Sequence, residues 1–225
     1  NKFLKIWRNR RSKSDTNYFL DILVSEHPDN LFTKKTILLY ADNLYKKKEK
    51  DKAMGLYMDV LYSAQDLDVA SEAAIRLSDY QMDAGKMKEA KEYLLKVLNV
   101  NEKFLLKDPM ASYKLAKRLY EHKLYDLAAR ISDLLLASLP KNAENKELLL
   151  KESGDWHAKA NEIDAANARY QEYLAAYKNN GEFTNAVSES LDALFFKTKE
   201  NNETVLENYY DKLIEKYSND IGQKA

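Results

Sequence analysis

The side chains with the widest range of possible chemistry are three histidines, because an imidazole can act near neutral pH as an acid, a base or a metal ligand. His27, His122 and His157 lie far apart in the sequence. His27 precedes Pro28 and His122 falls in a turn segment, so we expect solvent to reach both. The sequence has no H-E-x-x-H motif, no G-x-S-x-G motif, no glycine-rich phosphate loop and no cysteine. These observations predict neither an enzyme, nor a metal site, nor a cofactor site.

A second chemical feature is the basic N-terminal segment 1–14, NKFLKIWRNRRSKS. Helical spacing would place Phe3, Ile6 and Trp7 on one apolar face. Such a segment suits an acidic partner, a membrane surface or RNA, and it equally suits the remnant of a preceding helix. We expect the remnant and keep an RNA- or membrane-docking adaptor as the alternative. The cations of the segment are Lys2, Lys5, Arg8, Arg10, Arg11 and Lys13.

Composition and charge narrow the fold class and the partners. Lys and Arg total 36 and Asp and Glu total 36, so no global field attracts nucleic acid or a membrane surface. The 225 residues are 45% apolar but include only five Gly and three Pro, which favours long helices with short connections. No apolar run reaches the roughly 20 residues of a membrane span. No signal peptide is visible, but the chain begins with Asn1 rather than Met, so a leader or further domains before it stay open.

An internal repeat supplies the elements that position the side chains. Four alanines spaced 37, 38 and 38 residues apart occupy equivalent places in helical segments: Ala53, Ala90, Ala128 and Ala166. Small residues also lie twelve positions before each of them: Ala41, Ser78, Ala116 and Gly154. Small residues at both places let two antiparallel helices approach closely across a short turn, so each repeat is expected to be one helix pair.

The turns and the ends of the chain fit this register. Short turns are expected inside four pairs, at residues 46–51, 83–87, 121–126 and 159–164. The predicted units are residues 15–33, 34–70, 71–108, 109–146, 147–184 and 185–217, and a frayed tail follows at 218–225. The last unit is a variant, because Val205 or Leu206 replaces its small marker residue.

The pattern resembles the tetratricopeptide repeat (TPR) over residues 15–217. That family sets small residues at its eighth and twentieth positions, a large residue near the twenty-fourth and a proline near the thirty-second. The corresponding residues here are Ala41, Ala53 and Tyr57; Ser78, Ala90 and Leu94; Ala116, Ala128 and Pro140; and Gly154, Ala166 and Tyr170. The period of 37–38 instead of 34, the missing early tryptophan and the few prolines depart from the family pattern. The resemblance implies an all-α fold, a right-handed superhelical α-solenoid of about five antiparallel helix pairs. A Sel1-like or other helix-pair solenoid and a plain helical bundle are the alternatives.

In TPR proteins the first helix of each pair lines a concave groove that binds a protein or peptide. The residues at the family's groove positions are Lys35, Leu38, Asp42, Tyr45, Glu72, Ile75, Asp79, Met82, Met110, Tyr113, Lys117, Tyr120, Leu148, Lys151, Asp155 and Ala158. The expected anchors are Tyr45, Met82, Tyr113 and Tyr120, since Tyr and Met suit protein-binding surfaces. Packing against the next repeat explains single members equally well. Asp42 and Asp79 stand where chaperone-binding members need asparagine, so capture of a C-terminal carboxylate is not expected.

The sequence therefore predicts a non-catalytic protein–protein interaction scaffold or adaptor that needs no cofactor. Its partner is expected to be another protein or peptide in the groove, with no nucleic acid and no integral membrane span. Richness in Lys, Asn and Tyr suggests an AT-rich bacterial genome. In style and composition the chain is similar to periplasmic scaffolds of bacterial envelope machines, such as the paralysed-flagellum TPR proteins of the flagellar motor. The periplasm is thus slightly favoured over the cytoplasm, and the partner and the oligomeric state are not predicted.

Overall fold

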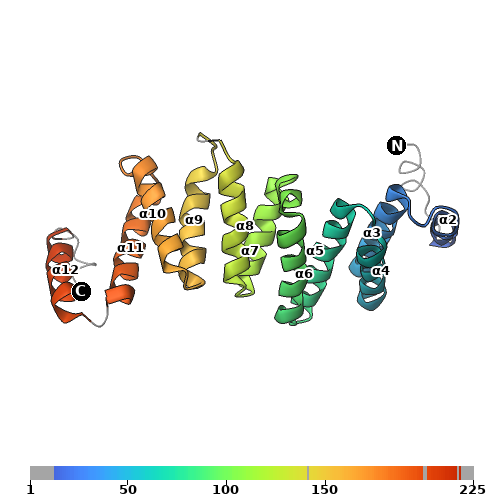
Figure 1. Cartoon of the computed structure of the whole chain (residues 1–225), viewed down its shortest axis with the longest axis horizontal. Coiled ribbons are helices and arrows are strands. Elements are labelled where there is room, and N and C mark those ends of the chain that lie inside the picture. The colour runs from blue at the N-terminus through green and yellow to red at the C-terminus, as the bar shows by residue number, and fades with distance from the viewer. Residues whose placement is uncertain (1–12, 141, 200–201, 217, 219–225) are drawn as a thin grey trace. The chain divides into compact units, whose positions relative to one another are not determined.

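The computed structural model describes residues 13–140, 142–199, 202–216 and 218. Across these residues the chain is helical, with eleven α-helices, one short 3-10 helix and no β-strand, which confirms the all-α prediction (Figure 1). Residues 1–12 of the basic N-terminal segment and most of the predicted frayed tail lie outside the described residues, and Lys13 and Ser14 belong to the first described helix. The helices are α2 (Lys13–Glu26), α3 (Leu31–Lys46), α4 (Lys50–Ser63), α5 (Leu67–Asp83), α6 (Met87–Val100), η1 (Glu102–Leu106), α7 (Pro109–Glu121), α8 (Tyr125–Ser138), α9 (Lys146–Lys159), α10 (Ile163–Tyr177), α11 (Thr184–Lys199) and α12 (Glu203–Lys216).

The helices group into two compact units, residues 1–111 (unit 1) and 112–225 (unit 2), with α7 beginning in the first and continuing in the second. Within unit 1, α3 packs on α4, α4 on α5, and α5 on α6. Within unit 2, α8 packs on α9, α9 on α10, and α10 on α11 (Figure 1). Within each unit, these helices thus contact their neighbours in the sequence, as in a helical-repeat fold. We call α3, α5, α7, α9 and α11 the first helices and α4, α6, α8, α10 and α12 the second helices.

The core of unit 1 shows why the sequence forms these pairs. Apolar side chains at helical spacing on α3, α4 and α5 meet in one cluster, and burial of this apolar surface is the main stabilising contribution. Two first helices also begin at side-chain caps: Asn30 accepts a hydrogen bond from the Phe32 amide, and Asp66 accepts from Asp68 and Val69. The buried cluster consists of Ile37, Leu38, Ala41, Leu44, Ala53, Tyr57, Val60, Val69, Ala73 and Leu77.

The turn inside the helix pair has the same backbone conformation in four successive pairs. Four residues with φ between 63° and 74° occupy equivalent positions: Lys48, Gly85, Lys123 and Asn161. After each of them, the next amide donates to the carbonyl oxygen five residues earlier; for example, the Glu162 amide nitrogen lies 2.9 Å from the His157 oxygen. This bond and the left-handed residue together form a Schellman-type helix end. The turns recur at intervals of 37, 38 and 38 residues, so the backbone repeats with the period of the marker alanines.

The small residues at the predicted helix crossings are buried, and one pair is joined directly. The Ser78 hydroxyl donates to the Ala90 carbonyl oxygen at 3.0 Å. The fourth pair differs from the expectation that two small residues simply face each other. A Cβ atom on Gly154 would lie 2.3 Å from Cε1 of Tyr170, so the tyrosine ring fills the space that the glycine leaves. Position 154 therefore requires a glycine, because a larger residue would overlap this ring.

Aromatic rings join the two helices of the last pair. Phe195 of α11 stacks on Tyr209 of α12 with 3.8 Å between ring centroids, and Phe196 lies 4.7 Å from Tyr210. No described side chain of α12 is buried.

Candidate functional site

The first helices of unit 1 carry a polar link centred on Asp42. The Tyr57 hydroxyl donates to Asp42 Oδ1 at 2.8 Å, and Arg76 donates to both carboxylate oxygens, from Nε at 2.7 Å and from a terminal nitrogen at 2.9 Å. Such a two-pronged arginine–carboxylate contact is strong and directional. Burial raises the pKa of Tyr57, and the hydrogen bond to Asp42 raises it further. Asp42 therefore joins α3, α4 and α5, and its charge is balanced by Arg76.

Tyr45, an expected anchor, is half-buried and already has a partner. Its hydroxyl donates to Asp83 of α5, which also accepts a hydrogen bond from Lys50 at 3.0 Å. Its ring packs edge-on against Tyr80 at 6.4 Å between centroids. Burial raises the pKa of Tyr45, and Asp83 adds to this effect. The tyrosine thus links two first helices and presents only part of its ring to solvent.

Two predicted groove residues are part of the core instead. Leu38 and Met82 are each 1% exposed, so neither can contact a partner protein. Both lie on first helices, and Leu38 belongs to the buried cluster of α3, α4 and α5. Of the other predicted positions in unit 1, Lys35 is exposed, and Glu72, Ile75 and Asp79 are partly buried.

In unit 2 the predicted residues of α7 and α9 come together. The Tyr113 hydroxyl donates to Glu152 Oε2 at 2.7 Å, and the Lys117 ammonium lies 3.7 Å from Glu152 Oε1. The same ammonium lies 5.6 Å from the centre of the Tyr113 ring. Burial raises the pKa of Tyr113, with a further contribution from Glu152. Tyr113 is partly exposed and Lys117 is exposed, so this group of three presents an aromatic ring and a cation on neighbouring first helices.

Aromatic contacts continue along the same two helices. Tyr120 lies 6.0 Å from Trp156 of α9 and 5.1 Å from Tyr125, measured between ring centroids. One turn earlier on α9, Lys151 pairs with Asp155 at 2.7 Å. The structure therefore brings five of the predicted groove residues of unit 2 onto two first helices that contact each other.

A tyrosine–aspartate bond recurs inside the helix pairs and was not recognised in the sequence. Tyr170 donates to Asp155 at 2.7 Å in the fourth pair, as Tyr57 donates to Asp42 in the first. In both cases the aspartate follows the small residue of the first helix, and the tyrosine lies four residues after the small residue of the second helix. These fixed offsets are the sequence signal that could have identified Asp42 and Asp155 as structural residues.

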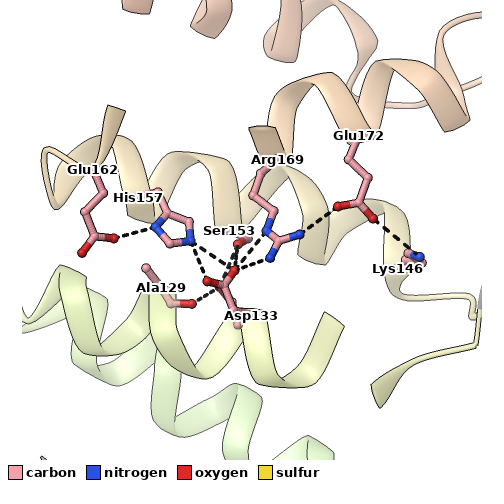
Figure 2. Close-up of polar contacts among 9 residues, drawn as sticks. Ala129, Asp133, Lys146, Ser153, His157, Glu162, Arg169 and Glu172 are labelled. Atoms are coloured by element: carbon pink, nitrogen blue, oxygen red, sulfur yellow. Dashed lines mark hydrogen bonds and ion pairs between the residues drawn. The ribbon is translucent and has the colours of Figure 1, made fainter. Parts of the chain in front are cut away.

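A row of charged side chains lies at the junction of α8, α9 and α10 (Figure 2). His157 of α9 has its Nε2 atom 3.1 Å from both carboxylate oxygens of Asp133 and its Nδ1 atom 2.6 Å from Glu162 Oε2. Arg169 of α10 donates to the other side of Asp133, with nitrogen–oxygen distances of 3.0 and 2.8 Å. Arg169 continues to Glu172 at 2.8 Å. We call Asp133, His157, Glu162 and Arg169 the histidine cluster.

The pKa values of the histidine cluster are coupled. Burial by itself would lower the pKa of His157, but hydrogen bonds with Asp133 and Glu162, and their charges, raise it above the ordinary value of 6.5. Burial by itself would raise the pKa of Asp133, but His157 and Arg169 hold it below the ordinary value of 3.8. Ser153 adds a hydroxyl 3.3 Å from Asp133.

His157 was not predicted as a site residue, although its position in the repeat indicates that it is buried and needs polar partners. The equivalent residues of α3, α5 and α7 are Leu44, Gln81 and Leu119, and all three are buried. A histidine in this core position requires polar partners, since an unpaired buried polar group is costly. Asp133 occupies the position of Met58 and Leu95 in the earlier second helices, so the repeat alignment pairs two unusual polar residues.

Unit 2 also contains a cleft of about 460 Å³ between α10, α11 and α12. Its walls include Leu191 and Phe195 together with Asp164 and Asp192. Tyr209 and Lys216 also line the cleft, and both bind Asp192. None of the predicted groove residues lines this cleft.

Among the described residues, no group of His, Asp and Glu has an arrangement that could hold a metal ion, and no helix has the length and apolar character to cross a membrane. Both ring nitrogens of His157 face carboxylates, so the ring has no free nitrogen to act on a substrate.

Comparison with known proteins gives a distant likeness in structure. No protein-family model and no curated protein matches the sequence. BtubC (BKLC) from P. vanneervenii is 17% identical, with 88% of this chain and 85% of that chain covered and a TM-score of 0.45. The APC/C hetero-tetramer Cut9-Hcn1 is 15% identical, with 95% of this chain and 45% of that chain covered and a TM-score of 0.39. Both are TPR-like helical-repeat proteins. At these TM-scores neither likeness supports an argument about function.

Proposed function

We propose that the chain is a non-catalytic protein–protein interaction scaffold that binds a protein or peptide on the faces of its first helices. The observation that carries this proposal is the group formed by Tyr113, Lys117 and Glu152 on α7 and α9. A partly exposed aromatic ring beside a cation and a carboxylate can bury apolar surface and still make directional contacts. Fixed intramolecular bonds hold the tyrosine in place, so little side-chain entropy is lost on binding.

Site-specific photo-crosslinking locates the binding face even while the partner is unidentified. A photoreactive phenylalanine analogue is placed at Tyr113 in unit 2 or at Ile75 in unit 1, and the matched control is Tyr62, a 67% exposed tyrosine on the second helix α4. We expect adducts from the first-helix positions and none from Tyr62. Adducts from Tyr62 alone would contradict the proposal.

Affinity measurements with the identified partner then test the anchor. Truncating a central aromatic anchor commonly costs about 2 kcal/mol or more of binding free energy, so we expect Tyr113→Ala to weaken binding by at least tenfold while the helical circular dichroism is retained. Tyr113→Phe keeps the ring and removes the hydrogen bond to Glu152, so it separates the contribution of the ring to the affinity from that of the hydrogen bond. If Tyr113→Ala binds normally and deletion of residues 1–14 abolishes binding, the basic N-terminal segment is the binding element instead.

The setting of the scaffold is a separate proposal. Its richness in Lys, Asn and Tyr supports a bacterial source. The lack of cysteine and the irregular TPR-like repeat support an envelope assembly such as the flagellar motor, with a periplasmic location. Fractionation of source cells with an antibody against the chain tests this location. Recovery in the cytoplasmic fraction alone would contradict it.

A further inference from the structure

We propose that the histidine cluster is a proton-dependent clasp, which holds α8, α9 and α10 together while His157 is charged and loosens their junction when His157 loses its proton. The starting point is that each ring nitrogen faces a carboxylate, at 2.6 Å to Glu162 and 3.1 Å to Asp133. An imidazolium donates from both nitrogens, whereas a neutral imidazole donates from only one. Loss of the proton therefore leaves one carboxylate facing a lone pair.

The order of charges along the histidine cluster increases the effect that loss of the His157 proton has on the junction. With His157 protonated, the row Glu162, His157, Asp133, Arg169 and Glu172 alternates in sign from end to end (Figure 2). With His157 neutral, no cation remains between Glu162 and Asp133. Like charges without an intervening cation repel each other, and a buried site screens this repulsion less than water does.

Burial limits how far water can take over the lost contacts. His157 is 4% exposed, so its ring depends on protein partners. The side chains of Asp133 and Glu162 are 35% and 46% exposed, so solvent screens part of their repulsion. The clasp is therefore expected to loosen the junction and leave the helices themselves formed.

Charged groups on the other helices packed near α9 are bound elsewhere. Lys117 of α7 pairs with Glu152, and Lys197 of α11 donates to Asn161 at 2.8 Å. The groups that act on His157 are thus Asp133 from α8 and Glu162 from the turn, with Arg169 of α10 acting through Asp133.

The direction of the pH dependence follows from the raised pKa of His157 and the lowered pKa of Asp133. The pKa of His157 is raised, so its stabilising contribution is fully present below the ordinary value of 6.5 and is lost as the pH rises through the raised value. The pKa of Asp133 is lowered, so its contribution is present above 3.8 and is lost as the pH falls through the lowered value. The clasp is therefore closed between about pH 4 and 6.5 and opens at higher pH.

Hydrogen exchange of the intact chain at pH 6.0 and 8.5, corrected for the intrinsic effect of pH, tests the clasp directly. We expect amides of α8–α10 to exchange several-fold faster at pH 8.5, because loss of the His157 proton removes one of its two hydrogen bonds to a carboxylate. Helices α3–α6 are the internal control, because residues 31–100 contain no histidine. A parallel change in both regions would overturn the proposal.

Two further measurements keep the test decisive. In a variant with His27→Gln and His122→Gln, NMR titration of the remaining histidine reports His157 alone, and a pKa at or below its ordinary value would refute the clasp. His157→Gln introduces the residue found at the equivalent position in α5 and should remove the pH dependence of exchange in α8–α10. His122→Gln, in a turn, should keep it. If His157→Gln does not fold, the titration still decides.

Discussion

The α4–α5–α6 junction of unit 1 and the α8–α9–α10 junction of unit 2 use the same repeat positions for different chemistry. Unit 1 has Met58, Leu77, Gln81, Lys86 and Tyr93 where unit 2 has Asp133, Ser153, His157, Glu162 and Arg169. The junction of unit 1 relies mainly on apolar burial, which is non-directional and independent of pH. The junction of unit 2 relies on charges whose geometry and protonation must match. The repeat register therefore determines which positions contact each other, and it does not determine which residue types occupy them.

The variant with the largest expected effect is Asp133→Met, which places the unit 1 residue in unit 2. It leaves His157 and Arg169 without their shared carboxylate, and breaking a buried charge pair costs about 3–5 kcal/mol. The partial exposure of Asp133 places the expected loss near 3 kcal/mol at pH 6. Urea unfolding followed by circular dichroism measures it. The matched control Met58→Leu should change stability by less than about 1.5 kcal/mol, and equal losses would refute the contrast.

Replacing Asp133, His157 and Arg169 together should restore most of that loss. The triple variant Asp133→Met, His157→Gln and Arg169→Tyr carries the residues of unit 1 at the equivalent positions. Exchange of buried charged residues for packed neutral ones is often neutral or stabilising, and the retained Glu162 side chain is 46% exposed, so we expect a recovery of about 2 kcal/mol over Asp133→Met. Its stability should also be the same at pH 6.0 and 8.5. A triple variant less stable than the single one would show that the two junctions are not interchangeable.

A helical glycine in each unit differs in the space available for a side chain. Gly154→Ala places a Cβ 2.3 Å from the Tyr170 ring, so we expect a loss of about 2 kcal/mol from overpacking. A Cβ on Gly55 of α4 would have no neighbouring atom within 4 Å, so Gly55→Ala should gain about 0.5–1 kcal/mol through helix propensity. Thermal melts of the two variants should shift in opposite directions. A Gly154→Ala variant as stable as wild type would mean that the ring can move aside.

The smallest expected effect concerns the repeated turn. Gly85→Ala in unit 1 puts a Cβ at φ 74° and should cost about 1 kcal/mol. Asn161→Gly in unit 2 should change stability by only a few tenths of a kcal/mol, because asparagine tolerates this conformation. Urea unfolding followed by circular dichroism measures the stability of both variants. Equal changes would mean that the two turns are held by contacts other than the backbone.

The sequence by itself determined the helical class, the helix pairs and their period. These features depend on local properties: apolar spacing, small residues at the crossings and turns at a regular interval. For this reason the expected turns at 83–87 and 159–164 contain the left-handed residues Gly85 and Asn161. The sequence also indicated the first helices as a candidate surface and placed Tyr113 and Lys117 on it.

Only the tertiary structure decided which side chains of that surface are free and which are bound. Spacing could not separate buried Leu38 and Met82 from exposed Lys35, because coverage depends on where the neighbouring helix lies. Nor could it place His157 between Asp133 and Glu162, which lie 24 and 5 residues away in sequence. Such contacts arise from the way successive pairs stack and from the reach of each side chain, and the repeat period specifies neither.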